Sequence, residues 1–414
     1  IPVMSIVRSK DGRSFLLPFI LVTSLFFLWG FAHSILDVLN KHFQDVLVIS
    51  KARSGLVQAM VYGGYFLMAI PAGWIIRRYG YRAGIVTGLL LYGAGALLFI
   101  PGGKIMSFPF FLLCLFIIGC GLTCLETSAN PYVTVLGDND SAARRLNLAQ
   151  SFNGLGWVVG PLVGGMLILG DESNISLPYA VIGTVVIILG IVFSRLKLPS
   201  VGSDGRQDVP SGGSGSDSVW KIRTFKYGVP ALLLYVAAQT GINSFFINYV
   251  IESDPEISAR AAALMLSFGG MGLFMIGRLI GSAVMKYIKP SRLMGICSVA
   301  ATICMALVIC NMGMLSLTAL CLTYLFESIM FPTLFSMAIA GVSGDNTKKA
   351  SSFLVMSIVG GAIAPVLMGL IGRDSMAAGF VLPLVCFVFI AVYAGRYDGL
   401  SRPSHSGKPQ VSAQ

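Results

Sequence analysis

Hydrophobic residues in this chain fall into long runs that short polar segments separate. A helix needs about 20 mostly apolar residues to cross a bilayer. By that length the first half contains six candidate spans, at about 15–39, 54–76, 83–101, 108–134, 146–170 and 178–196. The second half contains six more, at about 227–250, 260–287, 293–312, 315–341, 351–372 and 377–395. The pattern predicts an all-α integral membrane protein with twelve transmembrane helices.

The two sets of six spans repeat each other. In the fourth span Glu126 is followed by Pro131, and in the tenth span Glu327 is followed by Pro332 at the same spacing. With six spans in each half, both copies cross the membrane in the same direction, as parallel repeats. In transporters built from such repeats, the substrate site lies near the midplane, between the repeats.

The polar segments divide the chain into four parts. We expect a six-helix half at 1–198, a cytoplasmic linker at 199–225, a second six-helix half at 226–396 and a cytoplasmic tail at 397–414. The linker contains Ser-Gly-Gly-Ser-Gly-Ser, a composition typical of flexible chain.

Composition supports the membrane assignment. The chain is 55% hydrophobic and 11% charged, whereas soluble domains carry about 25% charged residues. The net charge of +11 is not accompanied by a basic stripe with interleaved aromatics, so we do not expect nucleic acid as a partner. The eight cysteines lie inside apolar runs without metal or disulfide spacing, and we expect free thiols.

Basic residues in the loops predict the orientation. The side with both termini carries 22 Lys and Arg, the opposite side carries 6, and Arg278 lies inside a span. Because cytoplasmic loops are enriched in Lys and Arg, we expect both termini in the cytoplasm. We expect a multi-pass monomer in the lipid bilayer.

Two carboxylates in the first half are candidates for carrying a proton. Asp37 and Glu126 lie in apolar spans, where a carboxylate usually faces a cavity and has a function. Burial disfavours the charged form, so such a group can carry a proton at neutral pH. The alternatives are that Asp37 is a solvated residue at the end of its span, and that Glu126 is a structural hydrogen-bond partner.

Polar side chains at helical spacing predict a substrate site. Residues three or four apart share one face of a helix, and amides offer a sugar both donors and acceptors. The candidate substrate-binding residues are His33, Asn130, Gln150, Asn153, Gln239, Asn243 and Glu327. His33 could instead tune Asp37 or only pack, and Glu327 could instead pair with Arg278.

Two motifs carry a resemblance to a known family. The stretches 124–137 (CLETSANPYVTVLG) and 145–153 (RLNLAQSFN) resemble the fucose–galactose–glucose:proton symporters of the major facilitator superfamily, the bacterial L-fucose permease and its relatives. Shorter matches (FFLW, YVAAQT, FPTLFS, SSFLVM) extend the resemblance from about residue 14 to residue 395.

The resemblance implies a function and a location. It implies proton-coupled uptake of a monosaccharide such as L-fucose, glucose or galactose, across a bacterial inner membrane. It places the two functional carboxylates at Asp37 and Glu126, and span-5 amides at Gln150 and Asn153. The chain departs from the permease near His33 and at Asn243 and Glu327, so the identity of the sugar stays open.

Other functions remain as alternatives. A sodium-coupled sugar carrier or an efflux transporter would use the same fold. A receptor or membrane enzyme is a third alternative, but the three histidines (33, 42 and 405) are scattered and form no catalytic constellation. We expect no enzymatic activity, no metal and no cofactor beyond the coupling proton.

Overall fold

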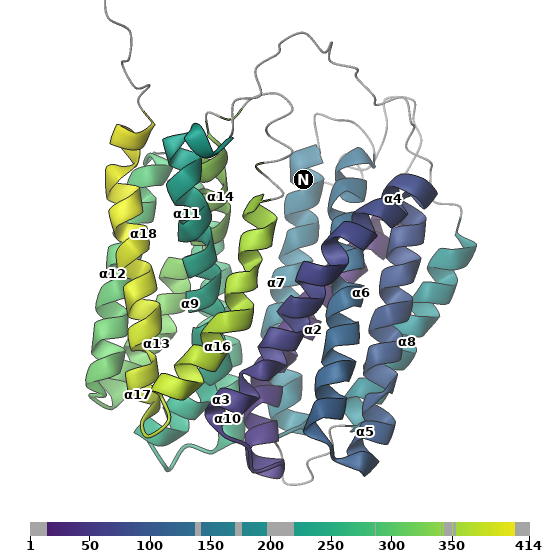
Figure 1. Cartoon of the computed structure of the whole chain (residues 1–414), viewed down its shortest axis with the longest axis horizontal. Coiled ribbons are helices and arrows are strands. Elements are labelled where there is room, and N and C mark those ends of the chain that lie inside the picture. The colour runs from purple at the N-terminus through teal and green to yellow at the C-terminus, as the bar shows by residue number, and fades with distance from the viewer. Residues whose placement is uncertain are drawn as a thin grey trace, which may run out of the picture.

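The structure is a computed structural model that describes residues 15–136, 142–169, 176–196, 219–285, 287–340, 342, 350 and 353–401. Two groups of helices stand side by side, the first half of the chain on the right of Figure 1 and the second half on the left. Both ends of the described chain lie at the top of this view. No strand occurs among the described residues.

The first half consists of long helices that pack in two groups. Its elements are α2 (Leu16–Val46), α3 (Lys51–Ser54), α4 (Leu56–Leu97), α5 (Phe99–Ile105), α6 (Phe108–Val135), α7 (Ala142–Leu167) and α8 (Ser176–Arg195). α4 contains two of the predicted spans, and its direction changes at Gly80, where φ is 84°. Glycine allows this positive φ because it has no Cβ. α4 packs on α6 and α8, and α2 packs on α7.

The second half has shorter, interrupted helices. Its elements are η3 (Val219–Lys221), α9 (Arg223–Ser253), α10 (Ala259–Leu264), η4 (Met265–Met271), α11 (Gly272–Val284), α12 (Pro290–Cys310), α13 (Met314–Glu327), α14 (Met330–Ile339), η5 (Ser357–Val359), α16 (Gly360–Ile371), α17 (Met376–Gly379) and α18 (Val381–Leu400). η4 is a π-helical turn inside the predicted span 260–287. The predicted span 315–341 is divided between α13 and α14.

The helices account for the predicted spans. Eleven helical segments of the described chain are long and apolar enough to cross a membrane. The remaining predicted span, 146–170, is α7, a helix of 26 residues with the amides Gln150 and Asn153. α7 lies against α2, α10 and η4, so much of its surface faces protein. An interior helix can carry polar groups that a lipid-facing helix cannot.

The predicted linker and tail fall only partly on described residues. Residues 197–218 lie outside the described chain, but Val219–Lys221 forms η3 and α9 already begins at Arg223. In the tail, α18 continues to Leu400, and residues 402–414 are not described. The division into domains stays a prediction.

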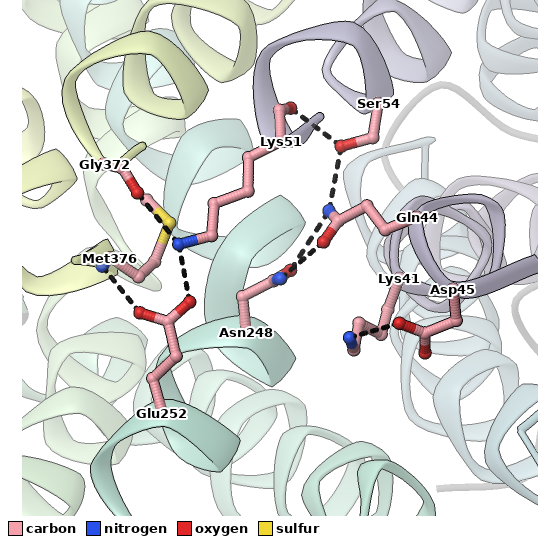
Figure 2. A network of polar contacts seen from close by, with 9 residues as sticks. All are labelled: Lys41, Gln44, Asp45, Lys51, Ser54, Asn248, Glu252, Gly372 and Met376. Atoms are coloured by element: carbon pink, nitrogen blue, oxygen red, sulfur yellow. Dashed lines mark hydrogen bonds and ion pairs between the residues drawn. The ribbon is translucent and has the colours of Figure 1, made fainter. Parts of the chain in front are cut away.

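An ion pair joins the two halves at the end of the bundle opposite the chain termini. Lys51 Nζ lies 2.6 Å from Glu252 Oε1 and donates to the main-chain oxygen of Gly372 at 2.9 Å (Figure 2). The Met376 N–H donates to Glu252 Oε2 at 2.7 Å. One lysine of the first half therefore holds both α9 and the α16–α17 turn of the second half.

Amides extend this junction. Asn248 Nδ2 donates to Gln44 Oε1 at 2.6 Å, and Gln44 Nε2 donates to Ser54 Oγ at 2.8 Å (Figure 2). Backbones also approach closely, since a Cβ on Gly369 would lie 2.6 Å from the Ala52 nitrogen. We call the polar residues of this junction, Gln44, Lys51, Ser54, Asn248, Glu252 and Gly372, the outer seal.

The hydrogen bonds between the halves are unevenly placed. Besides the outer seal, the described residues of the two halves are joined by Asn40 to Ser244, by Thr240 to Tyr62 and by Ser267 to Val158. All these bonds lie between the middle of the bundle and the outer seal. The described chain is thus closed at the end predicted to be extracellular.

Removing the charge of Lys51 should loosen this end. Lys51→Met removes the ion pair and the bond to Gly372, so the halves should separate there. Spin labels on Val48→Cys and Met312→Cys, both exposed at this end, should report a longer distance by double electron–electron resonance, in a background where exposed Cys310 is serine. Lys41→Met is the control, because Lys41 forms its ion pair within α2, with Asp45 (Figure 2). Unchanged distances in Lys51→Met would show that the contacts of Lys51 do not hold the halves together at this end.

Candidate functional site

A cavity of about 300 Å³ lies between the two halves. α4 and α6 form its polar wall, and the segment that leads into α16 forms the opposite, apolar wall. The lining residues are Tyr62, Tyr65, Phe66, Ala69, Thr123, Glu126, Thr127, Asn130, Val355, Met356, Ile358 and Val359. Its volume is at the lower end of the range for small-molecule sites.

The hydroxyl of Tyr65 is the centre of the polar wall. It accepts a hydrogen bond from Trp29 Nε1 at 2.7 Å and lies 3.0 Å from His33 Nε2. It also interacts with the carboxyl group of Glu126. One tyrosine of α4 therefore connects α2 to the acidic residue of α6, at the wall of the cavity.

His33 is enclosed by aromatic rings. Its ring stacks on Trp157, with centroids 5.8 Å apart and planes inclined by 18°. Tyr62 and Tyr65 lie at 5.8 Å and 5.4 Å from it. Among the described residues, Tyr65 is the one side-chain hydrogen-bond partner of His33, so the ring position is set by packing and by Tyr65.

Asp37 lies one helical turn from His33 and is 1% exposed. Its Oδ1 accepts a hydrogen bond from Gln58 Nε2 at 2.9 Å, and its Oδ2 has no partner. This burial excludes the alternative of a solvated residue at the end of the span. Asp37 is not among the residues that line the cavity.

The amides of α6 and α7 have different positions. Asn130 lines the cavity, and its Oδ1 accepts a long hydrogen bond from Gln150 Nε2 at 3.3 Å. Asn153 Nδ2 donates to the main-chain oxygen of Phe26 at 3.1 Å. Asn153 therefore fixes α7 against α2, and one of its donors is already used.

The predicted residues of α9, Gln239 and Asn243, do not line the cavity. Between Gln239 and Asn243, Thr240 donates to the Tyr62 hydroxyl of the first half at 3.3 Å. Asn243 is 3% exposed, and its Oδ1 has no partner. Gln239 is half-buried.

Glu327 is fully buried, with neither carboxyl oxygen hydrogen-bonded. The expected alternative, a pair with Arg278, is not formed, since no ion pair joins these two described residues. Arg278 Nε instead points to the main-chain oxygen of Ser328, at 3.4 Å.

The structure thus brings some predicted residues together and separates others. Tyr65 connects Glu126 with His33, and Asn130 and Gln150 lie beside them, whereas the acceptors of Asn243 and Glu327 are buried elsewhere. Sequence reasoning missed Gln58, Tyr62 and Tyr65. The available signal was their spacing, since these three polar side chains recur four and three residues apart on one face of an apolar span.

Among the described residues, no group of three His, Cys, Asp or Glu side chains is placed to hold a metal. All eight cysteines are free thiols.

Comparison with known sequences identifies relatives along most of the chain. Residues 15–357 match the sequence profile of the Major Facilitator Superfamily. The chain is 37% identical to the L-fucose-proton symporter of Escherichia coli (strain K12), over 93% of this chain and 94% of that protein. It is 35% identical to the glucose/galactose transporter of Brucella abortus biovar 1 (strain 9-941), over 90% of this chain and 92% of that protein.

Solved structures share the fold. The crystal structure of FucP, a Major Facilitator Superfamily transporter, in the outward conformation matches with a TM-score of 0.67 and 36% identity, over 93% of this chain and 99% of that chain. A bacterial homologue of the human lysosomal transporter Spinster, inward-facing and occupied, matches with a TM-score of 0.72. That match has 15% identity and covers 93% of this chain and 96% of that chain, so it shows the fold alone.

Removal of the Tyr65 hydroxyl should destabilise the polar wall. Tyr65→Phe leaves the Trp29 indole and the His33 ring without their shared partner. An unsatisfied buried group costs about 1–3 kcal/mol, so the free energy of unfolding should fall by about that amount, as measured by denaturation in detergent. Tyr81→Phe is the control, because no hydrogen bond of its hydroxyl is seen among the described residues. Equal stability of the two variants would contradict the central role of Tyr65.

Proposed function

The chain belongs to the Major Facilitator Superfamily, and from that premise we propose that it takes up a monosaccharide together with a proton. The observation that carries this proposal is the carboxyl group of Glu126 on the wall of the cavity, with Asn130 beside it. The names of relatives that match most of this chain, L-fucose-proton symporter and glucose/galactose transporter, support it.

We assign the coupling proton to Glu126 and Asp37. Glu126 interacts with the Tyr65 hydroxyl and faces the cavity, so it can exchange a proton with water that enters. One carboxyl oxygen of Asp37 has no hydrogen-bond partner. In such surroundings, burial of the neutral carboxyl group costs much less free energy than burial of the carboxylate. Coupling requires only that the proton and the sugar favour the same conformations.

The sugar would bind to the polar wall. Asn130 and Tyr62 present an amide and a hydroxyl to the cavity, and Gln150 reaches it through Asn130. His33 and Asn153 would act by fixing the positions of Tyr65 and α2. Movement of the halves would bring Gln239 and Asn243 to the sugar, because Thr240, which lies between them in the chain, already contacts the cavity residue Tyr62.

The outer seal supports alternating access. In this conformation the outer seal joins the described halves by an ion pair and hydrogen bonds, so the site would exchange with the side of the chain termini. We propose that this side is the cytoplasm of a bacterial cell, across the inner membrane, and that the transporter is a monomer.

Uptake of labelled L-fucose, glucose, galactose and mannose into membrane vesicles tests the proposal. An imposed inward proton gradient should cause one of these sugars to accumulate, and an uncoupler should abolish the accumulation. Accumulation that follows a sodium gradient and ignores the uncoupler would replace the proton by sodium. Failure of all four sugars to accumulate would contradict uptake of these monosaccharides.

Neutral substitutions of the two carboxylates should separate binding from coupling. With a gradient of one pH unit, one coupled proton supports accumulation of at most about tenfold. We expect Glu126→Gln and Asp37→Asn each to lower proton-driven accumulation by about that factor, while exchange of sugar across the membrane continues. Asp45→Asn, at the exposed end of α2, is the control. Unchanged accumulation in both carboxylate variants would contradict the assignment.

A further inference from the structure

The carboxyl group of Glu327 lies outside the cavity and outside the proton site of the first half. Glu327 is the last residue of α13, directly before the break at Ser328 and Ile329. It is 0% exposed, and neither of its oxygens has a hydrogen-bond partner. No described cation lies within 4 Å of it.

The groups around Glu327 do not neutralise it. Tyr235 of α9 donates its hydroxyl to the main-chain oxygen of Glu327, at 3.1 Å, and not to the carboxyl group. From α11, Arg278 lies over the Phe274 ring at 4.8 Å and reaches Ser328. From α12, Cys304 lies buried against Thr323, one helical turn before Glu327 in α13. α14 and η4 contribute no titratable group.

This environment determines the charge of Glu327. A carboxylate inside a membrane protein needs a cation or hydrogen-bond donors, and without them its burial costs far more than that of a neutral carboxyl group. Glu327 has neither of these partners, so its surroundings favour the neutral carboxyl group over the carboxylate.

The surroundings of Glu327 extend toward the first half. Tyr324, one helical turn earlier in α13, lies within electrostatic range of both Glu327 and Asp37 of α2. The Tyr324 hydroxyl is buried and has no hydrogen-bond partner, and the same is true of Asp37 Oδ2. A carboxyl group of each half, Glu327 without any hydrogen bond and Asp37 with one to Gln58, thus lies in the surroundings of one unpartnered hydroxyl.

We propose that Glu327 is a second proton carrier, in the C-terminal half, whose proton moves in the same cycle as the proton of the first half. This inference rests on the proposed symport. Arg278 contacts Ser328, the residue next to Glu327, and has no acidic partner among the described residues. A shift of α11 relative to α13 would bring the guanidinium to the carboxyl group, and the released proton would pass to water in the opened interface.

The infrared carbonyl stretch of protonated carboxyl groups tests the charge state without transport. In purified protein at pH 7.5, Glu327→Gln should lose one such band that persists in the double variant Asp37→Asn with Glu126→Gln. Glu256→Gln is the control, because Glu256 is exposed. If Glu327→Gln does not fold, the double variant alone remains decisive. Absence of any protonated carboxyl band from that double variant would overturn the proposal.

Accumulation tests the coupling, with the sugar that the wild type accumulates. Across one pH unit, loss of one of two coupled protons lowers the limiting accumulation about tenfold, from about 100-fold to about tenfold. We expect this fall in Glu327→Gln, with the KM for sugar unchanged. A raised KM with the accumulation ratio intact would make Glu327 a sugar contact and would overturn the proposal. If the wild type accumulates no sugar, the proposed symport fails, whereas the infrared result still decides whether Glu327 holds a proton.

Discussion

The structure depends on the cost of leaving a charge without a partner at membrane depth. A buried ion costs several kcal/mol or more unless a counter-ion and hydrogen bonds compensate. The two ion pairs seen among the described residues, Lys41 with Asp45 and Lys51 with Glu252, lie at the partly exposed end of the bundle. Deeper in the bundle the acidic side chains meet tyrosine, glutamine or no polar group at all. Protonation is the remaining way to make such carboxyl groups compatible with their surroundings.

The same cost explains how the halves can separate. The outer seal consists of an ion pair and amide bonds between groups that are partly exposed, with Lys51 18% and Glu252 36% exposed. Partly exposed ion pairs contribute little net stability, because water competes for both charges. A junction of this kind can fix the register of two rigid halves and still open at small cost. A fully buried ion pair at the same position would hold one conformation too strongly for a transport cycle.

The sequence was sufficient for the fold and for the deepest acidic residues. Long apolar runs and the repeated Glu-x-x-x-x-Pro pattern predicted the helices, since lipid permits few alternatives to a helix. The sequence did not reveal the partners of these residues. Tyr65 and Gln58 meet Glu126 and Asp37 only because α4 crosses α6 and α2 at particular heights, and crossing geometry is a property of tertiary packing. For the same reason Asn153 and Asn130 look equivalent in the sequence. In the structure Asn153 holds α7 against α2, whereas Asn130 faces the cavity.

The repeat explains why two equivalent glutamates have different environments. In α6 the helix continues through Pro131, and Glu126 stays on the face that meets α4 and the cavity. In the second half the helix stops at Glu327 and restarts at Met330, so that Pro332 falls in the first turn of α14, where proline is tolerated. This break leaves Glu327 in the packed interior beside Tyr235, without access to the cavity in this conformation. The two copies of this helix thus place their glutamates differently. Water can reach the carboxyl group of Glu126 from the cavity, whereas Glu327 can exchange its proton only when the halves move.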